Sequence, residues 1–362
     1  MRAARGREAR RGPVGAAPEG PPRRRAGRRA GAILARPADA PVLPDRFLDR
    51  LARIVPPDRL HAVAATFGAP LATGFRVCTL LAGEAETVAA LRAEGVEPEP
   101  LAGVPGGYAV PPAQRAALLA SAPYAAGHVY VQNPSSQLPP HLLGARPGER
   151  VLDLCAAPGS KTGQLAALMG DRGEVVAVEK VRPRFERLRR NVAAQGATCV
   201  RPLHGSGAAT WRFEPEAFDR VLLDAPCSTE GRFRADEPET TRYWSPRKIK
   251  EMRAKQRTLL FSAVQSLRAG GTLVYSTCTF APEENEGVVA KALRTFGDRI
   301  ELVDAGLGEP LEARAQPGLA GWNDRAFPEA VGRTRRILPD GRFEAFFVAR
   351  LVKHASTLAP RR

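Results

Sequence analysis

The sequence predicts an α/β protein in which a small α+β unit precedes a doubly wound, mainly parallel sheet. The first observation is that, after Gly148, apolar runs of strand length alternate with longer segments of helical character, as in repeated βαβ units. The second is that apolar residues after Pro44 recur at helical spacing before a single strand-like run. A chain of 362 residues is long enough to bury one large core or two.

The expected elements follow in chain order. The first unit should hold helices through Phe47–Ile54 and Leu60–Phe67, a strand over 75–80 and a helix over 84–94. In the second unit, strands are expected near 150–154, 174–179, 198–203, 218–223, 272–276 and 343–351. Helices are expected near 161–169, 182–195, 246–268 and 282–295.

These elements suggest four regions. They are a disordered Arg-rich tail over 1–40, an N-terminal α+β domain over 41–126, a catalytic domain over 127–353 and a short tail over 354–362. The first tail carries eleven arginines and buries too little apolar surface to fold alone. It could be an electrostatic arm for RNA or merely a solvated tail.

The charge balance points to a polyanionic partner. The formal net charge is +16, and basic domains of this kind track phosphate backbones, although an Arg-rich compositional bias explains part of the excess. No apolar run is long enough for a membrane span, and the N-terminus has no secretory apolar region, so we expect a cytoplasmic protein. Five cysteines without a Cys-x-x-Cys pair give no support for a metal site or a disulfide framework.

A nucleotide-type cofactor loop is expected after the strand at 151–154. The run Cys155-Ala156-Ala157-Pro158-Gly159-Ser160-Lys161 forms a tight turn before a helix, where free backbone N–H groups attract anionic or polar ligands. Alone, this run could be an ordinary βα turn. The next strand ends at Glu179, whose carboxylate could accept hydrogen bonds from a ribose diol, so the two features together favour an adenosine-containing cofactor.

Two cysteines follow two other predicted strands. Cys227 stands in Asp224-Ala225-Pro226-Cys227-Ser228, and Cys278 stands in Ser276-Thr277-Cys278-Thr279. Parallel strands bring their carboxyl ends to one edge, so both thiols should face the same crevice as the cofactor loop. This arrangement suggests covalent chemistry on a bound substrate.

These three motifs, in this order and spacing, resemble those of the RNA (cytosine-5) methyltransferases. That family includes the bacterial ribosomal RNA enzymes and their nucleolar-protein and Sun-domain relatives, and the resemblance runs from about Pro44 to Lys353. It implies a Rossmann-like S-adenosylmethionine-dependent methyltransferase fold with an N-terminal RNA-binding domain. The implied cofactor is S-adenosyl-L-methionine.

The resemblance also implies the cofactor contacts. Cys155, Ala156, Ala157, Pro158, Gly159, Ser160 and Lys161 would hold the methionine and ribose parts of the donor. Glu179 would bind the ribose hydroxyls, Arg184 would add a further contact, and Asp224 would lie beside both donor and base. Ser206 departs from the family, which usually has an aspartate there for the adenine amino group.

The resemblance implies a different catalytic role for each of the two thiols. A thiolate that attacks C6 of cytosine makes C5 nucleophilic enough to accept a methyl group. In DNA cytosine-5 methyltransferases a Pro-Cys dipeptide supplies this nucleophile, which would nominate Cys227. In the RNA family, the Thr-Cys cysteine attacks, so Cys278 is the expected nucleophile, Cys227 the residue that assists product release, and Asp224 the partner of cytosine N3.

The expected partner is RNA, with ribosomal RNA favoured over tRNA, and the expected state is a monomer with no membrane association. A non-catalytic RNA-binding or ribosome-assembly factor that retains the fold is the alternative, motivated by Ser206. A DNA methyltransferase is disfavoured by the Cys278 motif. Tyr130, Tyr243 and Trp244 could stack on bases, although packing or positioning is the more ordinary role for each.

Overall fold

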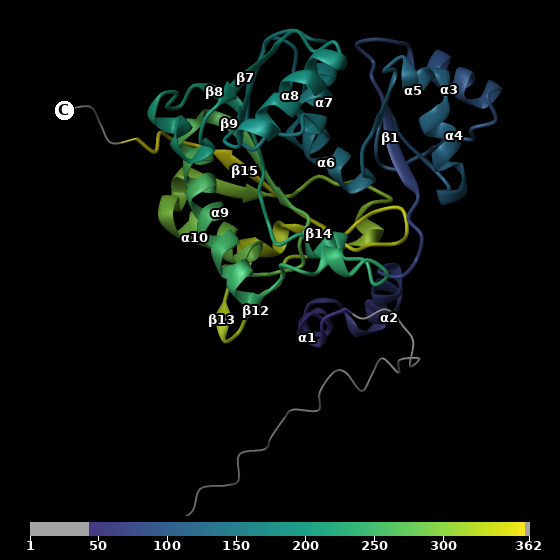
Figure 1. Ribbon diagram of the computed structural model, residues 1–362. Coiled ribbons are helices and arrows are strands. Elements are labelled where there is room, and N and C mark those ends of the chain that lie inside the picture. The colour runs from purple at the N-terminus through teal and green to yellow at the C-terminus, as the bar shows by residue number, and fades with distance from the viewer. Residues whose placement is uncertain (1–42, 359–362) are drawn as a thin grey trace, which may run out of the picture.

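The computed structural model describes residues 43–358, so the expected disordered tail over 1–40 lies outside the described residues. A nine-stranded sheet forms its centre (Figure 1). Its order is β11-β14-β15-β9-β8-β5-β6-β7, with β10 paired to β15. The five strands from β9 to β7 in this order run parallel, and β10, β11, β14 and β15 form an antiparallel end.

The parallel part confirms the expected doubly wound α/β fold. Its strands are β5 (Arg150–Asp153), β6 (Glu174–Glu179), β7 (Val200–His204), β8 (Phe218–Asp224) and β9 (Leu267–Thr277). The helices that cover it are α6 (Pro134–Leu143), α7 (Ser160–Leu168), α8 (Arg182–Ala194), α9 (Pro246–Ser266) and α10 (Glu286–Phe296). The antiparallel end comprises β10 (Ile300–Val303), β11 (Ala315–Pro317), β14 (Arg335–Ile337) and β15 (Phe346–Lys353).

Alternating side chains along each buried strand supply two core layers. On β6, Val175 belongs to a cluster with Leu143 of α6 and Leu165 of α7. Its neighbour Val176 points the other way, into a cluster with residues of α9 and α10. Both faces of the parallel sheet are therefore covered, which is why its strands are nearly continuous apolar runs.

A second, antiparallel sheet has the order β2-β3-β1-β4. It consists of β1 (Thr73–Val77), β2 (Glu99–Pro100), β3 (Gly107–Val110) and β4 (Val129–Val131), with α3 (Glu84–Ala93), α4 (Arg115–Ala120) and α5 (Ala122–Ala125). The expected strand over 75–80 ends earlier, at Val77, because Cys78 begins a turn closed by the N–H of Leu81. Pairing of β4 with β1 carries this sheet to Val131.

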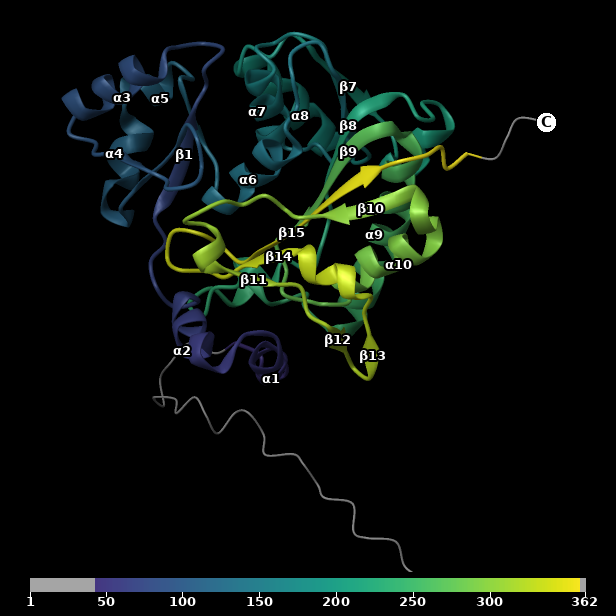
Figure 2. The same cartoon turned by 180° about the vertical axis from the view of Figure 1, so that it is seen from behind.

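The first two helices pack elsewhere. Figures 1 and 2 both show α1 (Asp45–Ile54) and α2 (Pro57–Thr66) beneath the larger sheet, apart from α3–α5. Phe47 of α1 packs edge-on against Phe233 with ring centroids 4.9 Å apart. Arg50 donates to both oxygens of Glu283, at 3.1 and 2.7 Å. The residues expected to form one N-terminal unit thus contact two different parts of the molecule.

One expected helix is shorter than predicted. The sequence pattern places it over 282–295, but α10 begins only at Glu286. The preceding residues turn inward because Asn285 donates to the carbonyl oxygen of Thr279 at 2.8 Å and accepts from Thr277 at 2.6 Å. This turn holds the segment that carries Cys278.

Candidate active site

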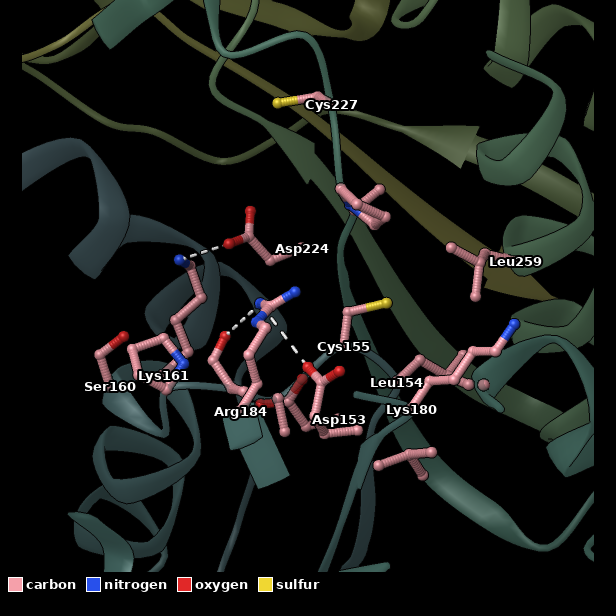
Figure 3. Close-up of a pocket in the computed structure, with 18 of the residues that line it drawn as sticks. Asp153, Leu154, Cys155, Ser160, Lys161, Lys180, Arg184, Asp224, Cys227 and Leu259 are labelled. Carbon is pink, nitrogen blue, oxygen red and sulfur yellow. Dashed lines mark hydrogen bonds and ion pairs between the residues drawn. The ribbon is translucent and has the colours of Figure 1, made fainter. Parts of the chain in front are cut away.

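A cavity of about 950 Å³ opens at the carboxyl ends of β5, β6, β8 and β9. Its walls bring together all but one of the site residues expected from the sequence: Cys155, Ala156, Ala157, Pro158, Ser160, Lys161, Glu179, Arg184, Ser206, Asp224, Cys227 and Cys278. Figure 3 shows Cys227 at one end of this cavity and Asp153 at the other, with Asp224 between them.

Gly159, the exception, shapes the loop without lining the cavity. Its φ is +104°, a conformation that side chains other than glycine rarely adopt. A Cβ atom there would lie 3.2 Å from Leu188 and 3.3 Å from Val192 of α8. Glycine therefore allows the loop to turn tightly against α8, so that α7 can begin at Ser160 with its first N–H groups close to the cavity.

Glu179 supplies a fixed carboxylate at the end of β6. It is 5% exposed, and its Oε1 accepts the N–H of Val181 at 2.7 Å. Arg184 Nη2 lies 3.6 Å from Oε2 and also donates to the carbonyl oxygen of Ala157 at 2.9 Å (Figure 3). Ser206 lines the same cavity, and its side chain makes no capping bond to the short helix at Gly207–Arg212.

Burial raises the pKa of two neighbouring groups at the end of β5. Asp153 is 1% exposed, and burial raises its pKa to about 6, although Thr162 donates to it at 2.8 Å. Burial, followed by the charges of Asp153 and Glu179, raises the pKa of the Cys155 thiol. A thiol that keeps its proton is a poor nucleophile, so Cys155 is suited to packing against a ligand rather than attacking one.

Both oxygens of Asp224 are oriented by donors. Lys161 Nζ lies 2.6 Å from Oδ2 (Figure 3). Ser276 Oγ lies 2.8 Å from Oδ1. Lys161 is itself fixed by Ser136, whose Oγ lies 2.5 Å from Nζ. The carboxylate is therefore held in one orientation between the cofactor loop and the two cysteines.

The two thiols form a close pair. Cys227 Sγ and Cys278 Sγ are 3.5 Å apart, and Cys278 is 8% exposed. The hydrogen bond from Cys227 lowers the pKa of Cys278, with the positive charge of Arg232 acting in the same direction against burial. The same hydrogen bond and burial raise the pKa of Cys227. This asymmetry favours a Cys278 thiolate with a protonated Cys227 beside it.

Hydrogen bonds behind the cysteines join their two loops. Ser228 Oγ and Thr279 Oγ1 are 2.8 Å apart, and Thr279 donates to Glu230 Oε2 at 2.9 Å. The N–H of Ser228 donates to Glu284 Oε2 at 3.0 Å, and Gln256 donates to the same oxygen at 2.7 Å. Each residue that follows a cysteine is thereby anchored to a buried carboxyl group.

Several cavity residues were not expected from the sequence. Ser136 was not singled out from the sequence, and its contact with Lys161 joins residues 25 positions apart. Arg232 had no local signal, because only the folded chain brings it to the cysteines. Of the aromatics, Tyr130 lines the cavity and Tyr243 is 75% exposed, whereas Trp244 packs against Phe47 with ring centroids 6.0 Å apart.

Residues 43–358 contain neither a candidate metal site nor a candidate membrane span. Within this range no group of three or more His, Cys, Asp or Glu side chains is arranged to hold a metal ion. Nor does the same range contain a helix that is long and apolar enough to span a bilayer.

Comparison with known proteins gives a consistent result. Residues 140–352 match the family model described as 16S rRNA methyltransferase RsmB/F. The ribosomal RNA small subunit methyltransferase F of Serratia proteamaculans is 36% identical over 318 residues, which are 87% of this chain and 64% of that protein. The relative from Aeromonas salmonicida is 36% identical over 88% of this chain and 65% of its own length. This chain thus spans a little under two thirds of the curated relatives it matches.

Two solved structures from Pyrococcus horikoshii share the fold. A methyltransferase homolog protein has a TM-score of 0.74 and 30% identity, with 86% of this chain and 95% of that chain covered. NSun6, solved with SFG, has a TM-score of 0.71 at 19% identity over 86% of this chain and 98% of that chain. Together they confirm the methyltransferase fold expected from the sequence.

Proposed function

Because this chain belongs to the 16S rRNA methyltransferase RsmB/F family, we propose that it methylates C5 of a cytosine in small-subunit ribosomal RNA, with S-adenosylmethionine as donor. The observation that carries the proposal is the pair of thiols 3.5 Å apart, in one cavity with Asp224 and the loop at 155–161. A methyltransferase that acted directly on a nucleophilic atom would need neither thiol.

The residues of the cavity fit the donor. Its volume of about 950 Å³ lies at the upper end of the range for small-molecule sites, which leaves room for a donor and a base. Glu179 would accept hydrogen bonds from the ribose hydroxyls, the N–H groups before α7 would hold the methionine part, and Ser206 would face the adenine. When bound, the donor supplies an electrophilic methyl group.

Cys278 would begin the reaction as the thiolate. Its Sγ would form a bond to C6 of the cytosine, the electron pair of the C5–C6 double bond would shift into the C4–C5 bond, and the C4–N3 pair would move onto N3, so that C5 becomes nucleophilic like an enamine carbon. Asp224, held by Lys161 and Ser276, would hydrogen-bond N3 and stabilise the adduct. C5 would then be able to accept the methyl group, and the donor would leave as the neutral thioether that keeps the electron pair of the broken sulfur–methyl bond.

Cys227 would act in the second half of the reaction. When a water molecule takes the C5 proton, the electron pair of the C5–H bond re-forms the C5–C6 double bond, and the C6–S bond breaks to release the Cys278 thiolate. With its sulfur 3.5 Å from that of Cys278, Cys227 is close enough to assist this step and the release of the product. A paired base would have to be extruded from its helix to reach either sulfur.

The test uses the full chain with labelled S-adenosylmethionine and 16S ribosomal RNA, both naked and in the small subunit. We expect 5-methylcytosine by mass spectrometry of digested RNA, and a Cys278→Ser variant should lose activity by at least about 10³-fold. Cys227→Ser should accumulate a covalent protein–RNA adduct, visible as a gel shift. Cys199→Ser changes a free cysteine outside the cavity and is the matched control.

The outcomes discriminate among the candidate functions. Tight RNA binding with no donor binding and no 5-methylcytosine would overturn the proposal in favour of a non-catalytic assembly factor. Methylation of tRNA but not of ribosomal RNA would keep the chemistry and overturn the substrate. Full activity of Cys278→Ser would reverse the assignment of the nucleophile.

A further inference from the structure

Arg232 lies at the cysteine end of the cavity. It ends the short helix Glu230–Arg232 and lines the cavity together with Cys227 and Cys278. The N–H of Gly231, the preceding residue, donates to the carbonyl oxygen of Cys278 at 3.0 Å. This bond ties the backbone of the arginine to the backbone of the cysteine, although the two lie 46 positions apart in the chain.

The charge of Arg232 is only loosely neutralised. Its Nε lies 3.5 Å from Glu344 Oε2, and its side chain is 57% exposed, whereas that of Glu344 is 17% exposed. This separation is longer than that of a charge-assisted hydrogen bond, which is usually 2.7–2.9 Å. The guanidinium therefore retains charge and N–H donors that it can direct to a second anion.

The other cations that line the cavity are either engaged or, like Lys180 after β6, distant from Cys227 (Figure 3). Lys161 is bound to Asp224 and Ser136 at 2.6 and 2.5 Å, and Lys255 is bound to Glu251 at 2.6 Å. Arg184 forms an ion pair with Glu179 at the opposite end of the cavity. Near the two sulfurs, Arg232 is thus the lining cation that is available to a thiolate.

We propose that Arg232 is a positioning residue that holds Cys278 as the thiolate before RNA binds. The inference deepens the proposed function, on which it rests, because a thiolate is the form that attacks C6. Cys278 also faces the thiol of Cys227 and the carboxylates of Asp224 and Glu344, and Glu284 lies behind the loop of Cys227. The carboxylates oppose ionisation, so a cation is needed to offset them.

The charges of Arg232 and Cys278 act on each other in the direction that this geometry implies. After the hydrogen bond from Cys227, the charge of Arg232 is the strongest influence that lowers the pKa of Cys278. Conversely, the charge of Cys278 is the main influence that raises the pKa of Arg232. Replacement of Arg232 by a neutral side chain should therefore favour the protonated thiol.

The test measures the rate of iodoacetamide alkylation of each cysteine against pH, by peptide mass spectrometry of the free full-length protein. In Arg232→Gln the pH midpoint for Cys278 should rise by about one unit, since a neighbouring opposite charge lowers a pKa by about 1–3 units and this one is partly exposed. The midpoint is the suitable readout because a thiolate of higher pKa is also more nucleophilic. Arg232→Lys keeps a cation and should recover most of the shift.

Arg242→Gln is the matched control. Arg242 is 60% exposed, pairs with Glu239 and does not line the cavity, so its loss should leave the midpoint unchanged. Arg232→Met keeps much of the aliphatic packing and repeats the test if the glutamine variant misfolds. An unchanged midpoint in a folded, uncharged variant would overturn the inference. The assay needs neither RNA nor donor, so a shifted midpoint without methylation would count against the proposed function alone.

Discussion

Glu284 should make the stability of the protein fall as the pH rises. It is fully buried behind the loop of Cys227, where its Oε2 accepts hydrogen bonds from the N–H of Ser228 and the side chain of Gln256. Burial raises its pKa to about 8, because these two donors compensate only part of the lost hydration. At neutral pH the folded protein therefore holds a proton on this carboxyl group.

The magnitude follows from linkage. An exposed glutamate in the unfolded chain has a pKa of about 4.3. Since the folded state binds the proton more tightly, the stabilising contribution is fully present below about pH 4.3 and is lost as the pH rises through the folded value. Each unit of pH within this window changes the free energy of unfolding by about 1.4 kcal/mol, which gives about 2 kcal/mol between pH 6 and 8.

Urea unfolding at pH 6 and pH 8 tests this reasoning. The wild-type protein should lose about 2 kcal/mol more between the two pH values than Glu284→Gln, which keeps an acceptor oxygen but cannot ionise. Glu239→Gln, at an exposed ion pair with Arg242, should behave like the wild type. Equal losses in the wild type and Glu284→Gln would refute the assignment of a raised pKa to this group.

Two further predictions concern a buried ion pair and the glycine of the loop before α7. Arg336→Met should lower the free energy of unfolding by about 3–5 kcal/mol, because it removes the guanidinium that lies 2.5 Å from the buried carboxylate of Glu286. Arg342→Met, at an exposed ion pair, should lower it by less than about 1 kcal/mol. Comparable urea midpoints for the two variants would contradict this prediction. Gly159→Ala should lower the free energy of unfolding by about 1–2 kcal/mol, since a φ of +104° strains a residue with a Cβ, and an unchanged urea midpoint would disprove that role.

Local sequence patterns were sufficient to predict the parallel part of the larger sheet. β6 was predicted over its full extent, Glu174–Glu179, because a strand buried on both faces is an uninterrupted apolar run. The short strands β10, β11 and β14 were missed, since segments of three or four residues show no detectable alternation. The strand ends also placed Cys227 and Cys278 at one edge, because parallel strands end on the same side of a sheet.

The difference between the two thiols depends on contacts that no local pattern encodes. Their separation of 3.5 Å, and the approach of Arg232 to Cys278, arise from loops that meet only when β8 and β9 pair. The packing of α1 against Phe233 likewise joins residues far apart in the chain. The sequence by itself thus determined the fold class, the cofactor loop and the pairing of two cysteines at one sheet edge. Tertiary structure decided which sulfur is favoured as the thiolate, because ionisation depends on the charges and hydrogen bonds around it in space.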